Sequence, residues 1–131
     1  MSGCNKIEET TTDNNNTSML YDAEFIMNKY QDGKSGYITI TGDKVAFKEA
    51  IFDYDDKAIM FVKEYMDEDF IEYDLSNAPE IFMIEFEDFT TKYKKVDYEF
   101  LSDNFKNYSS RPFYVEIIDN KISAIIEIYV P

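Results

Sequence analysis

The C-terminal segment alternates apolar and other side chains so regularly that it strongly restricts the fold of the chain. Residues 113–118 and 122–130 flank Asp119-Asn120-Lys121, a run of residue types that favour tight turns. Successive side chains of a strand point to opposite faces, so one face collects every second residue. That face would carry Ile122, Ala124, Ile126, Ile128 and Val130. The pattern predicts an antiparallel hairpin with this one face in the core.

A second hairpin is predicted in the first half of the chain. Residues 37–41 and 44–52 are rich in β-branched and aromatic side chains and flank Gly42-Asp43, a two-residue turn signal. Two further strands are expected over residues 70–75 and 81–86, separated by Ser76-Asn77-Ala78-Pro79. Strands therefore dominate the predicted structure.

Short helices are predicted between these strands. Apolar residues recur at spacings of three and four from Ala58 to Tyr65, after acids at Asp55 and Asp56 that could cap a helix. A second short helix is expected over residues 100–105. Residues 19–31 fit either a short helix or an edge strand, and residues 91–97 fit no single pattern.

These elements together predict an α+β fold. We expect a mainly-β, antiparallel curved sheet or partly open barrel, with two to three short helices packed over one face or end. The strand and helix patterns predict a core of aliphatic and aromatic side chains. Its expected members are Ile38, Ile40, Val45, Phe47, Ile59, Val62, Leu75, Ile84, Leu101, Val115, Ile117, Ile122, Ile126 and Ile128.

The N-terminal segment has a different character. Residues 5–18 contain one aliphatic residue, Ile7, and no aromatic one, so they cannot bury enough apolar surface to offset the entropy of ordering. We expect residues 1–18 to be a disordered polar tether and residues 19–131 to be one globular domain. Cys4 is the only cysteine of the chain, which excludes an intrachain disulfide.

Ser2-Gly3-Cys4 resembles the box at which bacterial lipoproteins are cut just before a lipid-carrying cysteine. The resemblance implies that Cys4 is the site of lipid attachment, with Met1 in place of the removed signal peptide. It also implies a domain anchored to the extracytoplasmic face of a bacterial cell membrane. A free, incidental thiol at Cys4 is the alternative.

Two further segments widen this resemblance. The run 36–45 around the Gly42-Asp43 turn, and the Pro112-Phe113 start of the C-terminal hairpin, are similar to small uncharacterised lipoproteins of Gram-positive bacteria. The likeness extends over about residues 36–131. It implies an architecture and a surface location, and no chemistry.

Charge restricts the partners of the chain. The net charge is -14, and residues 19–131 carry 12 basic and 24 acidic residues, a net charge of -12. A domain this acidic repels phosphate backbones and anionic lipid headgroups, so we expect no nucleic-acid partner and membrane contact only through the lipid.

The sequence offers little for catalysis or metal binding. Histidine is absent, which removes the commonest general base and metal ligand, and no glycine-rich phosphate loop is present among 4 glycines. Acidic clusters occur at residues 53–56, 67–69 and 85–88, but none has the spacing of an EF-hand loop, and helix starts, loops and outward strand positions account for them. We expect no enzyme, no metal and no cofactor.

The expected function is therefore a lipid-anchored, non-enzymatic binding or envelope-associated module. Its ligand would be a protein, a peptide or a small molecule. Tyrosines such as Tyr54, Tyr65 and Tyr108 could supply an exposed contact patch or half-buried parts of a core without tryptophan. The alternative is an acidic cytoplasmic inhibitor or nucleic-acid mimic that binds a basic partner.

Overall fold

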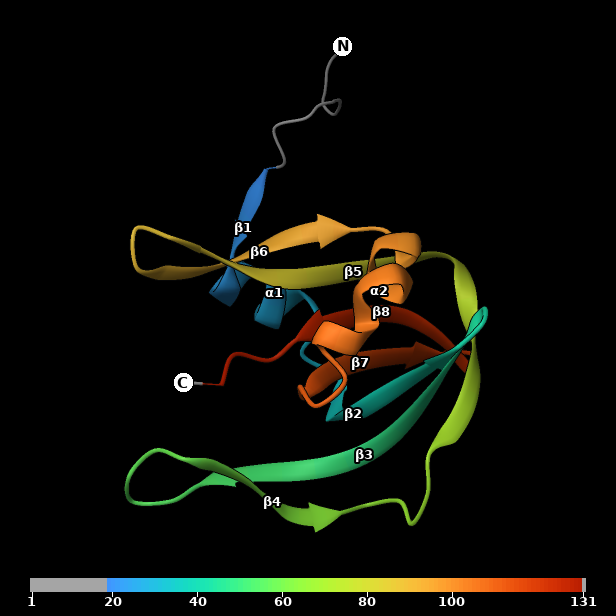
Figure 1. Ribbon diagram of the computed structural model, residues 1–131, viewed down its shortest axis with the longest axis horizontal. Coiled ribbons are helices and arrows are strands. Elements are labelled where there is room, and N and C mark those ends of the chain that lie inside the picture. The colour runs from blue at the N-terminus through green and yellow to red at the C-terminus, as the bar shows by residue number, and fades with distance from the viewer. Residues whose placement is uncertain (1–18, 131) are drawn as a thin grey trace.

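Five strands close into a barrel in the computed structural model, which describes residues 19–130 (Figure 1). The N-terminal segment 1–18, with Cys4, and Pro131 lie outside the described residues. The elements in chain order are β1 Leu20–Asp22, α1 Ala23–Lys29, β2 Lys34–Thr41, β3 Lys44–Tyr54, β4 Met60–Tyr65, β5 Ile71–Glu87, β6 Thr90–Val96, α2 Tyr98–Asn104, the 3-10 helix η1 Phe105–Asn107, β7 Phe113–Ile118 and β8 Lys121–Glu127.

The strand order of the sheet is β1-β6-β5-β8-β7-β2-β3-β4, and a further pairing of β3 with β5 closes the barrel. That pairing runs from Lys44 opposite Asp74 to Phe47 opposite Ile71. The mainly-β prediction with short helices is confirmed, but the barrel is closed, whereas we expected a curved sheet or a partly open barrel. One pair, β5 with β8, is parallel, in contrast to the expected antiparallel sheet.

The barrel has the connectivity of a five-stranded Greek-key barrel of the OB type. Its strands, taken in chain order, are β2, β3, β5, β7 and β8, and the last of them lies between the third and the fourth. Helix α2 is inserted between the third and fourth barrel strands. Such a barrel serves many unrelated functions, so its connectivity alone assigns none.

Both predicted hairpin turns are present. Gly42 has a φ of 64°, and Asp119 and Asn120 have φ values of 52° and 63°. The two successive positive φ values of Asp119 and Asn120 are the signature of a type I′ turn, whose twist matches that of paired strands. Glycine, aspartate and asparagine tolerate this conformation, which explains why the turns could be read from the sequence.

The prediction that Ile122, Ala124 and Ile126 are buried is confirmed, but the prediction that they share one face of the last strand was wrong. A β-bulge at Ser123 separates Ile117 opposite Ile122 from Glu116 opposite Ala124. The extra residue reverses the alternation, so Ile122 and Ala124 lie in different hydrophobic clusters. The Ser123 hydroxyl, 2.7 Å from a Glu116 carboxylate oxygen, occupies the bulge. Strand β8 is therefore buried on both faces.

Residues 76–79 do not separate two strands as expected. They lie inside β5, where the pairing with β8 shifts in register between Leu75 and Glu80. The first half of β5 pairs with β3 and closes the barrel, whereas the second half pairs with β6. Pro79 lacks an N–H to donate, so this segment is an irregularity in a bent strand.

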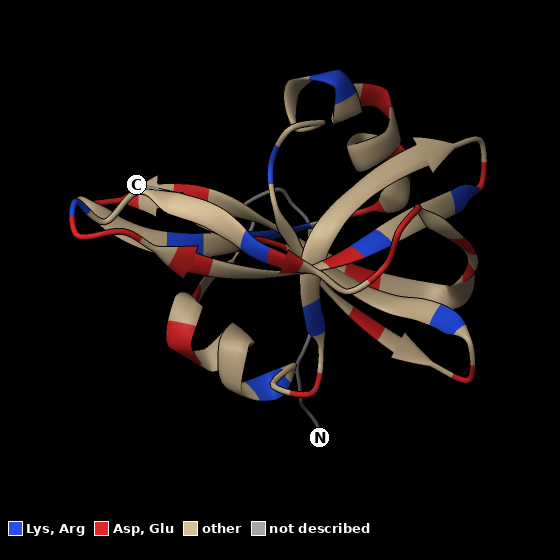
Figure 2. Cartoon of the chain, turned by 90° about the horizontal axis from the view of Figure 1, so that it is seen from below, with Lys and Arg blue, Asp and Glu red and all other residues tan. Residues whose placement is uncertain are grey.

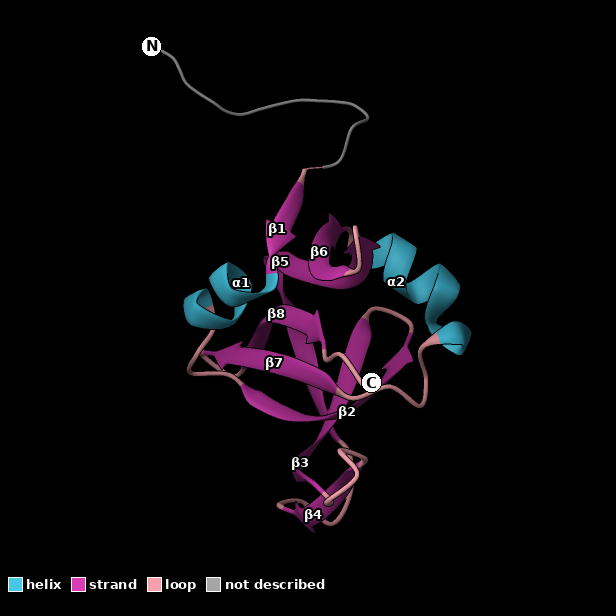
Figure 3. Cartoon of the chain, turned by 90° about the vertical axis from the view of Figure 1, so that its left-hand side faces the viewer, coloured by secondary structure: helices cyan, strands magenta, loops and turns pink. Residues whose placement is uncertain are grey.

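The helix predicted from Asp55 or Asp56 through Tyr65 does not form. Asp55 accepts hydrogen bonds from the N–H groups of Lys57 and Ile59, and its own N–H donates to the Ile59 carbonyl. These bonds close a turn, and the chain returns as β4 against the second half of β3. The β3–β4 hairpin projects from the barrel (Figures 1 and 3), which leaves the expected core residue Ile59 60% exposed and Val62 half-buried.

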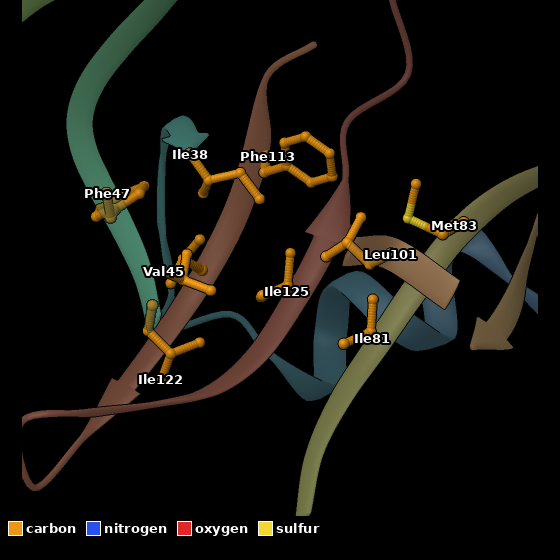
Figure 4. Close-up of a cluster of buried hydrophobic side chains, with 10 residues drawn as sticks. Ile38, Val45, Phe47, Ile81, Met83, Leu101, Phe113, Ile122 and Ile125 are labelled. Carbon is orange, nitrogen blue, oxygen red and sulfur yellow. The ribbon is translucent and has the colours of Figure 1, made fainter. Parts of the chain in front are cut away.

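Two hydrophobic clusters lie on opposite sides of β8. The larger fills the barrel, and Leu101 of α2 packs into it with Phe113 and Ile125 (Figure 4). The Asp97 side chain caps α2 by accepting a hydrogen bond of 2.8 Å from the Phe100 N–H. The second cluster lies under α1, whose Ile26 contacts the outer face of the barrel.

The predicted core is confirmed at half of its positions. The buried ones are Ile38, Val45, Phe47, Leu101, Val115, Ile122 and Ile126. The half-buried ones, besides Val62, are Ile40, Leu75, Ile84, Ile117 and Ile128. In residues 19–31 both expected alternatives occur, because β1 precedes α1, and the ambiguous segment 91–97 is mostly β6.

Candidate functional site

A pocket opens where β5 separates from β8. The parallel pairing between these strands ends at Phe82 opposite Ile126, while β5 continues to Glu87 with β6 as its partner. The segment after η1 covers the gap from the other side. The pocket has a volume of about 450 Å³ and is lined by Ile84, Phe86, Tyr108, Arg111, Glu127, Tyr129 and Val130.

Glu127 is a buried charged group in this pocket. It is the last residue of β8, and its side chain is only 4% exposed. Its Oε1 accepts a hydrogen bond of 2.9 Å from the Ile84 N–H, so a carboxylate oxygen takes the place that a strand carbonyl would occupy. Burial raises the pKa of the Glu127 carboxyl, while the Ile84 N–H and Arg111 oppose that rise.

The main chain of Glu127 is also fixed. The Tyr93 hydroxyl of β6 donates a hydrogen bond of 2.7 Å to the Glu127 carbonyl. Burial, followed by the nearby Glu127 charge, raises the pKa of Tyr93 to about 12, so this hydroxyl keeps its proton at neutral pH. The carboxylate is therefore held in one position from both ends of the residue.

Arg111 lies at the rim of the pocket. Its Nε is 3.7 Å from Oε2 of Glu127, and its side chain is 43% exposed. This distance is too long for a hydrogen bond, so the two groups form an ion pair that is not hydrogen-bonded. The Arg111 N–H donates to the Tyr108 carbonyl at 3.0 Å, and this turn places the guanidinium over the pocket.

Aromatic rings form the open wall. Phe86 and Tyr129 meet edge to face, with ring centroids 5.6 Å apart, and are 60% and 41% exposed. Tyr108, on the opposite segment, is half-buried. These rings lie beside the fixed polar groups of Glu127 and Arg111, so the pocket presents both apolar and polar surface to a small ligand.

The structure leaves the one sequence-predicted site residue untested. Cys4, the predicted lipid attachment site, lies outside the described residues. Within residues 19–130, no group of three or more acidic or cysteine side chains is arranged to hold a metal ion. Figure 2 shows acidic residues dispersed over turns and strands. No helix of the same segment is long and apolar enough to cross a membrane.

Sequence reasoning missed both charged residues of the pocket. The predicted alternation would put Glu127 on the strand face opposite the core, and Arg111 belongs to no predicted strand or helix. Two signals could have found them: Glu127 interrupts an otherwise apolar run, and Arg111 is the only arginine among 13 basic residues. Arginine differs from lysine in presenting a planar fork of donors, so its single use at this position is informative.

Of the tyrosines proposed for a contact patch, Tyr108 lines this pocket, whereas Tyr54 and Tyr65 are exposed on the β3–β4 hairpin. Tyr93 is buried, and Tyr73, Tyr98 and Tyr114 are half-buried.

Comparison of the chain with models of protein families, with curated proteins and with solved structures found no match.

The buried carboxyl gives a pH-dependent prediction. The raised pKa of Glu127 means that the ionised form destabilises the folded state, so its contribution is favourable at acid pH and is lost as the pH rises through the folded pKa. Glu127→Gln removes that charge and keeps an acceptor for the Ile84 N–H. We expect the variant to be more stable than the wild type by about 1 kcal/mol at pH 7.

This advantage should shrink toward pH 4, where the wild-type carboxyl is protonated. Urea unfolding followed by circular dichroism from pH 4 to pH 8 measures the difference, with Glu64→Gln on the exposed face of β4 as the control. A variant that is destabilised equally at both ends of this range would contradict the prediction.

Proposed function

We propose that this chain is a non-enzymatic binding domain, held at the extracytoplasmic face of a bacterial membrane by a lipid on Cys4, and that its ligand binds between β5 and β8. The observation that carries the binding proposal is the buried Glu127 carboxylate facing the pocket. Burying a charge is costly, and the more so without a hydrogen-bonded cationic partner. Here the Arg111 guanidinium stays 3.7 Å away, so both groups keep hydrogen-bonding capacity for a ligand.

The groups that line the pocket support binding in preference to catalysis. The described lining residues offer one carboxyl, one guanidinium and two phenolic hydroxyls, and no serine or cysteine nucleophile. The sequence has no histidine to activate a nucleophile. A single carboxyl held by the Ile84 N–H is suited to accept a hydrogen bond from a ligand.

Nucleic acid is an unsuitable ligand for this barrel. In OB barrels, oligonucleotides bind across the second and third strands and the turns beside them. The corresponding parts of this chain carry Glu72 and Asp74 on β5 and Asp43 and Asp119 in the turns. Lys44 lies 3.9 Å from Glu72 and 3.6 Å from Asp74, so its charge is already paired with these acids and is not free for a phosphate.

The anchor proposal is supported by the Ser2-Gly3-Cys4 motif and the polar composition of residues 5–18. The acidic domain would be repelled by anionic headgroups, so membrane association would depend on the lipid. A tether of this composition would hold the barrel away from the membrane surface and leave the pocket accessible.

The pocket is tested by titrating the isotope-labelled full chain with benzyl alcohol and recording amide NMR shifts. We expect the largest shifts at Ile84, Arg111 and Glu127. Phe86→Ala removes part of the aromatic wall and should weaken binding severalfold, whereas Phe61→Ala, an exposed residue of β4, should leave it unchanged. Equal effects of the two variants, or shifts spread over the surface, would contradict a pocket at this place.

The anchor is tested separately, on the native gene product expressed with its own upstream sequence. Metabolic labelling with an alkyne fatty acid should mark the wild type and fail to mark Cys4→Ala, and detergent phase partition should follow the label. An unlabelled, water-soluble wild type would overturn the anchor and favour the acidic cytoplasmic inhibitor.

A further inference from the structure

The two charges of the pocket form a pair that is incompletely joined. Oε1 of Glu127 accepts the hydrogen bond from the Ile84 N–H. Within residues 19–130, the one polar contact of Oε2 is with Nε of Arg111, at 3.7 Å. A guanidinium carries five N–H donors in a rigid fork. Among the described residues, the guanidinium of Arg111 donates no hydrogen bond to a side chain.

The positions of Glu127 and Arg111 restrict which charges a ligand of this pocket can carry. A ligand that is only anionic would meet the buried Glu127 carboxylate and the net charge of -14 of the chain. A ligand that is only cationic would meet the guanidinium at the rim. A zwitterion satisfies both groups, because its ammonium can donate to Oε2 and its carboxylate can accept from the arginine fork.

The positions of the two groups fit this division. Glu127 is fixed at the floor by bonds to both its side chain and its carbonyl. Arg111 has a 43% exposed side chain on a turn, so it can move by the small distance that a bound carboxylate requires. The exposed rings of Phe86 and Tyr129 remain for the apolar part of the ligand.

We infer that the pocket binds a free α-amino acid with an apolar or aromatic side chain. The ammonium donates to Oε2 of Glu127, the carboxylate accepts two hydrogen bonds from Arg111, and the side chain packs against Phe86 and Tyr129. The volume of about 450 Å³ accommodates such a molecule. This inference rests on the proposed binding function and names the ligand class of the same pocket.

The test compares four probes on the full chain by amide NMR titration at pH 7. L-phenylalanine carries both charges, L-phenylalaninamide lacks the carboxylate, N-acetyl-L-phenylalanine lacks the ammonium, and benzyl alcohol lacks both. We expect L-phenylalanine to bind at least about tenfold more tightly than each of the others, since each charge-assisted hydrogen bond is worth that much or more.

Variants assign the two contacts. Arg111→Gln should weaken L-phenylalanine at least about tenfold and leave benzyl alcohol unchanged, and Arg111→Lys should recover only part of the loss because an ammonium cannot bind a carboxylate in the same bidentate way. Glu127→Gln should weaken L-phenylalanine and L-phenylalaninamide but not N-acetyl-L-phenylalanine. Lys106→Gln, at an exposed residue of η1 that does not line the pocket, is the matched charge control.

The outcomes separate this inference from the proposed function. If benzyl alcohol shifts the pocket amides and L-phenylalanine binds no more tightly, the amino-acid ligand is wrong and the pocket stands. If a blocked derivative binds as well as L-phenylalanine, recognition of a zwitterion is wrong. If neither L-phenylalanine nor benzyl alcohol shifts these amides, the pocket and the inference both fail.

Discussion

Replacement of Phe113 by alanine should lower the free energy of unfolding by about 3–5 kcal/mol. Phe113 is fully buried at the start of β7 and lies in the barrel cluster with Leu101 and Ile125 (Figure 4). The substitution removes the ring and leaves a cavity that three different elements line, so no single element can move to fill it. A loss of this size is a large part of the 5–15 kcal/mol that stabilises a typical domain.

Phe89→Ala is the matched control, since the same ring is removed from a fully exposed turn between β5 and β6. We expect that variant to unfold within about 0.5 kcal/mol of the wild type. Urea titration followed by far-ultraviolet circular dichroism measures both. Similar unfolding midpoints for the two variants would show that the barrel interior is not packed as described.

Gly36→Ala should be the second most damaging of these changes, with a loss of about 3 kcal/mol or more. A Cβ at this position would lie 2.2 Å from the Lys48 carbonyl oxygen and 2.8 Å from the Phe47 ring. Gly36 is where β2 passes from pairing with β7 to pairing with β3. Because the nearest atom belongs to the backbone, a change of side-chain rotamer cannot relieve the clash, and the two strands must separate.

Thr41→Ala, at the exposed end of the same strand, controls for the effect of alanine on strand propensity. That change should cost well under 1 kcal/mol. Thermal unfolding of both variants beside the wild type would measure the difference. A Gly36→Ala protein that melts with the wild type would mean that β2 and β3 lie farther apart at Gly36 than they do in this structure.

Local signals were sufficient for the two predicted hairpin turns. Gly42 and the Asp119-Asn120 pair tolerate positive φ, and the flanking residues favour strands, so neighbours in sequence determine these structures. The same holds for α2, where Asp97 caps a short apolar stretch. The prediction of a helix after Asp55 failed because an aspartate can cap a helix or close a turn, and its local sequence suits both.

The pairing of distant strands was beyond such signals. The bulge at Ser123 moves Ile125 to the opposite face of β8 from the one that regular alternation predicts. The apolar pattern of the sequence gives no sign of this extra residue. Barrel closure requires β3 to pair with β5, and the sequence gives no register for that contact. The pocket follows from both, since Glu127 faces it only because β8 leaves β5 after Ile126.

By itself, the sequence determined that this chain forms a mainly-β domain of paired strands with short helices, and that its net charge is -14. Those properties depend on residue types and their spacing, which act over a few residues or over the whole surface. The tertiary structure alone decided that the barrel is closed, that β8 is buried on both faces, and that Arg111 meets Glu127. The physical reason is that strand register and burial arise from contacts between segments far apart in the chain, where the free energy of packing the whole barrel outweighs the preference of any one segment.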